Sequence, residues 1–389
     1  MLLRILHRTR YRYHGAIDMA QHMVHLRPVD TASQEVLSHE LRIDPNPAAR
    51  SETTDVFGNQ RTFFSLQSTH NMLTVEADSL VQTSAPEPLP EGAPWRAMSW
   101  ERVREHFRYR AQAPFDAASE FMFASPYVPR DDAFTAFARP AYKAGLPALE
   151  AARMLMERIH TELTYETDST EVNTPALAAL AQGKGVCQDF AHIMLGCLRS
   201  LGLPARYVSG YLLTRPPPGK PRLIGADASH AWVSVYVPVV NAAGATDGPT
   251  GAWFDFDPTN NRCGWGSPGE DYVTLATGRD FADVSPMRGV IQGGANHRLS
   301  VAVTVAPPGG LAAVSAALFA AVEQVEGAEL DSLSAGPGKG VRATLSYPAF
   351  SDLDSIRAAL TASGLSMTDQ STVEDGGRVV SEVIIGGMQ

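Results

Sequence analysis

The chain is poor in the residues that disulfide frameworks and metal clusters require. Its 389 residues include three cysteines, at positions 187, 197 and 263, an odd and scattered set that forms no disulfide framework and fits a reducing compartment. Pairings of the Cys-x-x-Cys or His-Glu-x-x-His type do not occur, and no acidic loop of the EF-hand form is present. We therefore expect neither a metal ion nor another cofactor.

Positive charge and long apolar runs are equally scarce. The formal net charge is −10 and no basic stripe stands out, which argues against a nucleic acid partner. No apolar run of about 18 residues occurs, so we expect neither a membrane span nor a membrane partner. Charged residues also interrupt Met1–Arg8 before the apolar region of a signal peptide could form. These absences predict a cytoplasmic protein.

The residues that are present predict an α+β protein with more than one domain, because 389 residues exceed one ordinary hydrophobic core. Short runs in which apolar and polar residues alternate predict an antiparallel β domain over residues 1–83. Asp55–Asn59 is typical of a hairpin turn between two of its strands. A proline-rich stretch over residues 84–97 indicates a linker. Residues 98–306 then carry helices followed by antiparallel strands.

Residues 185–201 predict a loop that delivers Cys187 onto the first turn of a buried helix, because apolar residues follow it with helical spacing. Asp189 falls in the same first turn, where the helix dipole favours an anion. This field, together with the unpaired N–H groups of the turn, stabilises the thiolate of a cysteine placed there. Cys187 is therefore the candidate nucleophile.

Two residues downstream complete a candidate catalytic set. His230 lies at the start of a predicted strand, and Asp257 lies at the end of the next one. A thiol that attacks an acyl carbon needs a base to share its proton and a carboxylate to hold the imidazole, and consecutive strands are often neighbours. Because side chains alternate along a strand, Asp255 and Asp257 share one face, and either carboxylate could reach the histidine.

Other candidates surround this set. The backbone N–H of Cys187 is the natural first donor to an oxyanion, and the Gln188 side chain and the Tyr165 hydroxyl are candidates for the second. His192 lies inside the same helix, and we interpret it as a structural or supporting residue. The other two cysteines are interpreted as a core residue and a loop residue.

Four stretches connect these residues to a known family. They are Gly185–His192, Leu198–Tyr211, Ala228–Val233 and Asp257–Asn260. Together with His7–Tyr13, Asp55–Asn59 and Gly278–Gly289, they make residues 1–306 resemble the bacterial transglutaminase-like family. The resemblance implies a papain-like core with Cys187 as nucleophile, His230 as base and Asp257 as orienting aspartate. The family tends to carry a small or apolar residue where Asp255 stands, which favours Asp257.

The resemblance implies a thiol-dependent acyl-transfer enzyme. Because no calcium-binding loop is present, we expect a cysteine peptidase or amidase that cleaves peptide or isopeptide amides of a protein or peptide substrate through a thioester on Cys187. One alternative is a protein cross-linking transglutaminase that uses amine acceptors. Another is a peptide-binding or assembly module without catalysis, which would have no use for a polarised thiol.

The last segment, residues 310–389, changes character after a Pro-Pro-Gly-Gly stretch. Its pattern of helix, two strands, helix and two strands predicts a ferredoxin-like α/β sandwich module. Leu345–Arg357 and Gly377–Glu382 are faintly similar to the ferredoxin-like C-terminal domain of the type II secretion L component. That similarity implies self-association, and we expect a homodimer through this module.

Overall fold

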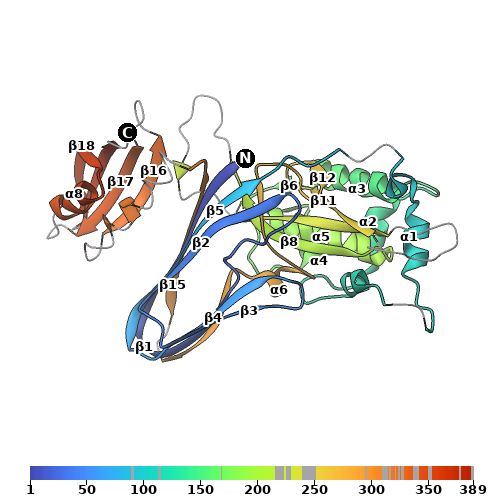
Figure 1. The fold of residues 1–389 in the computed structure, drawn as a ribbon, viewed down its shortest axis with the longest axis horizontal. Coiled ribbons are helices and arrows are strands. Elements are labelled where there is room, and N and C mark those ends of the chain that lie inside the picture. The colour runs from blue at the N-terminus through green and yellow to red at the C-terminus, as the bar shows by residue number, and fades with distance from the viewer. Residues whose placement is uncertain are drawn as a thin grey trace.

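The structure of the protein, a computed structural model, consists of a curved N-terminal sheet, a mixed helical and sheet core, and a C-terminal module (Figure 1). It describes residues 1–88, 92–112, 115–167, 169–214, 223–224, 229–238, 251–293, 296–308, 314, 317–319, 321–322, 325, 328–335, 341–348, 353–375 and 378–386. The sequence also predicts an exposed hairpin insertion over residues 238–252, and residues 239–250 of it lie outside the described residues.

The N-terminal sheet confirms the predicted antiparallel β structure. Its strands pair in the order β2-β5-β1-β4-β3, and β14 and β15 also pair with β1. They are β1 (Leu2–Val24), β2 (Gln34–Asp44), β3 (Ala49–Thr54), β4 (Gln60–Leu66), β5 (His70–Thr83), β14 (Met287–Gly293) and β15 (His297–Ala306). β1 spans 23 residues, and its register with β5 shifts between Arg12 and Ile17. The two halves of β1 can therefore pair with different strands.

Two strands of this sheet, β14 and β15, come from the C-terminal end of residues 98–306, the predicted catalytic domain. β15 pairs with the first half of β1, from Arg4 to Tyr13, and β14 pairs with the second half, from Ile17 to Val24. The N-terminal sheet is therefore built from both ends of residues 1–306. The domain boundaries drawn from the sequence stay predictions.

The core contains a five-stranded antiparallel sheet in the order β12-β11-β10-β8-β13. The strands are β8 (Ala205–Leu212), β10 (Ser229–Pro238), β11 (Gly251–Asp257), β12 (Arg262–Trp265) and β13 (Tyr272–Gly278). Side chains of β10 alternate between two environments. Ala231 and Val233 join Ile193 and Leu195 of the cysteine helix in one buried cluster. Ser234, the residue after Val233, therefore belongs to the opposite face.

Five helices precede the described core strands in the chain, and a short one follows them. They are α1 (Trp100–His106), α2 (Asp132–Ala138), α3 (Ala148–Glu162), α4 (Ala176–Gln182), α5 (Cys187–Ser200) and α6 (Phe281–Val284), with 3-10 turns at Pro94–Ala97, Ala117–Met122 and Arg139–Ala141. α3 and α5 pack against the core sheet (Figure 1). Among the described residues, no helix has both the length and the apolar character that crossing a bilayer requires.

The C-terminal module contains an antiparallel sheet in the order β18-β19-β17-β16, to which the two-residue β9 is added from the core. Its elements are β9 (Leu223–Ile224), β16 (Glu329–Ala335), β17 (Val341–Pro348), α8 (Leu353–Ala362), β18 (Ser366–Asp375) and β19 (Arg378–Gly386). β16, β17, α8, β18 and β19 lie where the sequence predicts two strands, a helix and two strands, whereas β9 is not predicted and most of the first predicted helix lies outside the described residues. The ferredoxin-like assignment and the homodimer stay predictions.

Two buried side-chain amides fasten the N-terminal domain to the free edge of β13. Gln34 donates to the carbonyl of Thr274 at 2.8 Å and accepts from its N–H at 2.7 Å. Asn59, at the end of the predicted hairpin turn, makes the same two bonds with Thr277, at 2.7 and 2.8 Å. The polar backbone groups of this edge strand are therefore satisfied without a further strand.

We expect Asn59→Ala to lower the free energy of unfolding by about 1–3 kcal/mol, because it leaves the N–H and C=O of Thr277 buried without partners. Chemical denaturation followed by tryptophan fluorescence measures this loss. Asn71→Ala, at an exposed position of β5, is the control and should stay within about 0.5 kcal/mol of the wild type. Equal stabilities of the two variants would contradict the fastening role.

Candidate active site

Cys187 is the first residue of α5, as predicted. The turn that leads into the helix is held by Asp189, whose carboxylate accepts from the Val186 N–H at 2.9 Å and from the Thr170 hydroxyl at 2.6 Å. Asp189 is buried, so its bonds are shielded from water. A Cβ atom at Gly185 would lie 2.7 Å from the Asp189 side chain, so this position requires glycine. Cys187, the candidate nucleophile, therefore follows a turn that is held in place by Asp189.

His230 links Cys187 to Asp257. Its Nε2 lies 2.7 Å from Oδ2 of Asp257. The imidazole is also hydrogen-bonded to the Cys187 side chain, which leaves Nδ1 as the nitrogen that faces sulfur. Burial alone disfavours a charged ring, but the hydrogen bonds and negative charges of Asp257 and Cys187 outweigh it and raise the pKa of His230 to about 10. The ring therefore holds its proton at neutral pH.

Asp257 is completely buried and accepts five hydrogen bonds. Its Oδ2 accepts from His230, from Nδ2 of Asn260 and from the hydroxyl of Tyr272, each at 2.7 Å. Its Oδ1 accepts from the backbone N–H of Thr259 at 2.9 Å and of Asn260 at 3.2 Å. Burial opposes ionisation, but the donors and the charge of His230 prevail and hold the pKa of Asp257 below its usual value.

Sequence reasoning does not single out Asn260 or Tyr272 as site residues. Asn260 ends the Asp-Pro-Thr-Asn stretch that carries part of the family resemblance, and that stretch is the signal for it. Its Nδ2 also lies 3.2 Å from Nε2 of His230. Tyr272 reaches the site from β13, and no local pattern marks it. The strand order alone brings its hydroxyl to Asp257.

Asp257, and not Asp255, is the carboxylate that bonds His230. Asp255 lies two residues earlier on β11, directly opposite Ser234 of β10. Burial raises the pKa of Asp255, while Ser234 and the positive charge of Arg206 act in the opposite direction. Asp255 and Asp257 therefore have different neighbours, although both side chains lie on the same face of β11.

Tyr165 lies beside the nucleophile. It pairs with Gly185 in the short parallel ladder of β6 (Thr164–Tyr165) and β7 (Lys184–Gly185). Its half-exposed ring stands edge-on to Phe190, with the ring centroids 6.2 Å apart. Burial, with the charges of Cys187 and Asp257, raises the pKa of its hydroxyl. The hydroxyl therefore stays protonated and can donate a hydrogen bond.

The Gln188 side chain is occupied elsewhere. Its amide Nε2 donates to the carbonyl of Val172 at 2.8 Å. This bond braces the loop before α4 against the start of α5. Of the two side chains predicted as the second oxyanion donor, Gln188 is thus committed to another bond, and Tyr165 stays the candidate.

His192 has the contacts of a packing residue. Its fully buried ring lies between those of Tyr127 and Tyr207, at centroid distances of 5.2 and 5.1 Å. Its Nε2 accepts from the backbone N–H of Phe281 at 3.3 Å. Burial lowers the pKa of His192 to about 3, so the ring is neutral. Cys197, further along α5, is also fully buried, and burial raises the pKa of its thiol.

These groups can perform nucleophilic acyl chemistry. A cysteine at a helix start lies beside a protonated imidazole, and that imidazole is held by an ionised carboxylate. The N–H of Cys187 has no acceptor inside its helix, since it belongs to the first turn, and can therefore donate to an oxyanion. In the part of the chain that the structure describes, no group of three or more His, Cys, Asp and Glu side chains is arranged to hold a metal ion.

Two family models match the chain. The bacterial transglutaminase-like N-terminal region matches residues 3–82, and the transglutaminase-like superfamily matches residues 135–258. The second match contains the three residues joined by hydrogen bonds, Cys187, His230 and Asp257.

Similar proteins occur in mycobacteria. An uncharacterised protein of Mycobacterium tuberculosis is 38% identical over 305 residues, which covers 78% of this chain and 92% of that protein. An uncharacterised protein of Mycobacterium leprae is 31% identical over 310 residues, which covers 78% of this chain and 98% of that protein.

The fold is shared with a solved structure. The crystal structure of a proposed cysteine protease from Cytophaga hutchinsonii superimposes with a TM-score of 0.56 at 19% identity, over 79% of this chain and 91% of that one. The antiparallel α+β core is thus that of the family named by the sequence matches. The chain belongs to the transglutaminase-like superfamily of thiol-dependent enzymes and carries the N-terminal region of its bacterial members.

Proposed function

We propose that the protein is a cysteine peptidase or amidase that cleaves peptide or isopeptide amides through a thioester on Cys187. The observation that carries this proposal is the hydrogen-bonded series Cys187, His230 and Asp257 at the start of α5. A thiol, a proton donor and an orienting carboxylate are the three parts that this chemistry requires. A protein or a peptide supplies the amide.

The first step starts from a thiolate and an imidazolium. The thiolate is the nucleophilic form of cysteine, and the raised pKa of His230 keeps the proton on the ring at neutral pH. Sulfur attacks the carbonyl carbon, the C–S bond forms, and the π electrons of the carbonyl move to its oxygen. The N–H of Cys187 and the Tyr165 hydroxyl donate to that oxyanion in this mechanism.

The second step expels the amine. The electron pair on oxygen re-forms the carbonyl, the C–N bond breaks, and His230 gives its proton to the departing nitrogen. Asp257 accepts the Nε2–H bond and keeps Nδ1 directed at the sulfur. Asn260 and Tyr272 act as positioning residues because their bonds to Oδ2 restrict rotation of the Asp257 carboxylate.

Water then resolves the thioester. Neutral His230 accepts a proton from water, the oxygen attacks the acyl carbon, and the C–S bond breaks to return the thiolate. Two residues beside the start of α5 are open to solvent: Tyr165 is 50% exposed and Val172 is 57% exposed. Transfer to an amine needs a site that excludes water, so this openness supports hydrolysis.

Thiol labelling tests the activated nucleophile. We expect iodoacetamide at pH 6 to modify Cys187 more than about tenfold faster than the exposed Cys263, because only Cys187 lies beside a protonated imidazole. Peptide mapping reads out each site. His230→Ala should slow Cys187 and leave Cys263 unchanged. Equally slow labelling of both cysteines in the wild type would sink the proposal and leave a binding module.

A second experiment tests whether water or an amine accepts the acyl group from the thioester. The substrates are a casein-like protein and a fluorescent primary amine. We expect new N-termini or released ammonia without incorporation of the fluorophore, and loss of both products in Cys187→Ala. Cys263→Ala is the matched control and should retain activity, because Cys263 is an exposed residue of β12. Fluorophore incorporation that depends on Cys187 would replace hydrolysis by cross-linking.

The raised pKa of His230 predicts an alkaline limit to activity. In the pH profile of kcat/KM, activity should fall as pH rises through about 10, where the imidazolium loses its proton. The same shift stabilises the folded state below the unfolded pKa of about 6.5, and this contribution disappears as pH rises toward 10.

Asp257→Asn should move this limit to lower pH, because it removes the charge and the hydrogen bond that raise the pKa of His230. We also expect kcat to fall by roughly 10²–10⁴-fold. Asp78→Asn, in the N-terminal sheet beside Arg4, is the control and should change neither quantity. An alkaline limit that Asp257→Asn leaves in place would contradict the coupling of these residues.

A further inference from the structure

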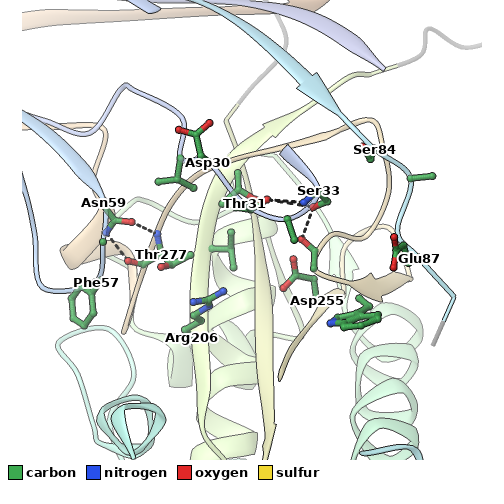
Figure 2. Close-up of a pocket in the computed structure, with 18 residues that line it drawn as sticks. Asp30, Thr31, Ser33, Phe57, Asn59, Ser84, Glu87, Arg206, Asp255 and Thr277 are labelled. Carbon is green, nitrogen blue, oxygen red and sulfur yellow. Dashed lines mark hydrogen bonds between the residues drawn. The ribbon is translucent and has the colours of Figure 1, made fainter. Parts of the chain in front are cut away.

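A cavity of about 540 Å³ lies between the core sheet and the N-terminal domain (Figure 2). The described residues that line it do not include Cys187, His230 or Asp257. They come from the loop after β1, the turn between β3 and β4, the start of the linker, and the core strands β8, β11 and β13. Its volume is that of small-molecule sites, which often occur between domains.

The floor of the cavity includes two charged residues of the core sheet, Arg206 of β8 and Asp255 of β11. Ser234 of β10 is in register with Asp255 on one side and with Arg206 of β8 on the other. Neighbouring strands lie about 4.8 Å apart, so the backbones of the two charged residues are about 10 Å apart. Figure 2 shows both side chains beneath Thr31 and Ser33. A positive charge, on Arg206, and a negative charge, on Asp255, are therefore separated across the floor of the cavity.

Arg206 carries a partly buried positive charge with an unused donor. Its guanidinium lies 4.2 Å from the ring centroid of Trp253. Its Nε is buried and has no hydrogen bond partner among the described residues. Burial lowers the pKa of Arg206 to about 10, against the effect of Asp255, so the group is charged at neutral pH. A buried guanidinium is stabilised by a carboxylate or another anion.

Asp255 offers the complementary charge. It is 4% exposed and lines the same cavity. The mouth adds two exposed carboxylates, Asp30 and Glu87. These three acidic groups repel a multiply charged anion such as a phosphate ester. The two opposite charges on the floor, Arg206 and Asp255, are matched by a ligand that carries one charge of each sign.

We propose that this cavity binds a small zwitterion with one carboxylate and one primary ammonium group, of the size of an amino acid or a dipeptide. The carboxylate pairs with Arg206, and the ammonium group pairs with Asp255. The hydroxyl group of Thr31 lies on the roof of the cavity, where it can complete the hydrogen bonds of the ligand. This site is separate from the cleavage site and does not depend on it.

Calorimetric titration of the full chain tests the proposal. The probes are glycine, L-alanine and glycylglycine, with acetate and methylamine as the two half-ligands. Cys187→Ser is used throughout, so that a dipeptide is not cleaved and a failure to bind is distinguishable from a failure of the proposed catalysis. We expect one-to-one binding of at least one zwitterion, more than about tenfold tighter than either half-ligand at matched ionic strength.

Asp255→Asn and Arg206→Met should each weaken that binding by more than about tenfold. Asp255→Asn preserves the size of the side chain and guards against a folding defect in Arg206→Met, which circular dichroism would report. Arg139→Met, at an exposed position outside the cavity, is the control and should bind as before. Heats equal to those of added salt, or an affinity that Asp255→Asn does not change, would overturn the proposal.

Discussion

The candidate active site depends on a carboxylate that is fully withdrawn from water. Removing a charge from solvent costs several kcal/mol unless it is paired and hydrogen-bonded, and Asp257 meets that condition with five donors. These come from β10, from the turn after β11 and from β13, so the geometry of the site is tied to the order of the strands. The charge of Asp257 in turn keeps His230 protonated beside the thiol.

The register of β10 and β11 places Asp257 and Asp255 in two different environments. On β11, Asp257 ends the strand at His230, whereas Asp255 faces Ser234 and Arg206 two positions earlier. Trp232 lies between them, with its ring 5.4 Å from that of Tyr272 and 6.2 Å from that of His230. A sheet of five short strands can therefore hold one charged centre at its end and another within its face.

Local sequence was enough for the parts of the site that lie on single elements. The start of α5 at Cys187 follows from helical spacing and a first-turn aspartate, and the positions of His230 and Asp257 follow from strand ends. Alternation alone leaves Asp255 and Asp257 equal, and the sequence favoured Asp257 only through the family resemblance; the hydrogen bond to His230 and the register of β10 and β11 separate the two in the structure. Tyr272 could not be found because its approach to Asp257 depends on the placement of β13.

The same limit applies to the larger architecture. Residues 287–306 read correctly as the end of the family resemblance, but nothing in their composition shows that they pair with β1. The roles of the Gln34 and Asn59 side-chain amides could not be predicted either, because they depend on contacts with the backbone of β13, which is distant in the sequence. Pairings between distant segments are decided by the assembled fold and not by local pattern.

The pairing of β1 with β14 and β15 sets an order of events during synthesis. The first strand leaves the ribosome early, while its partners at residues 287–306 follow only after the whole core has been made. β1 can pair with β4 and β5 in the meantime, which leaves its other edge open to pairing with a second nascent chain. Arg8, Arg10 and Arg12 are on that strand, and charged side chains of this kind discourage edge-to-edge aggregation. The arginines of β1 thus protect the incomplete chain from aggregation until β14 and β15 have been synthesised.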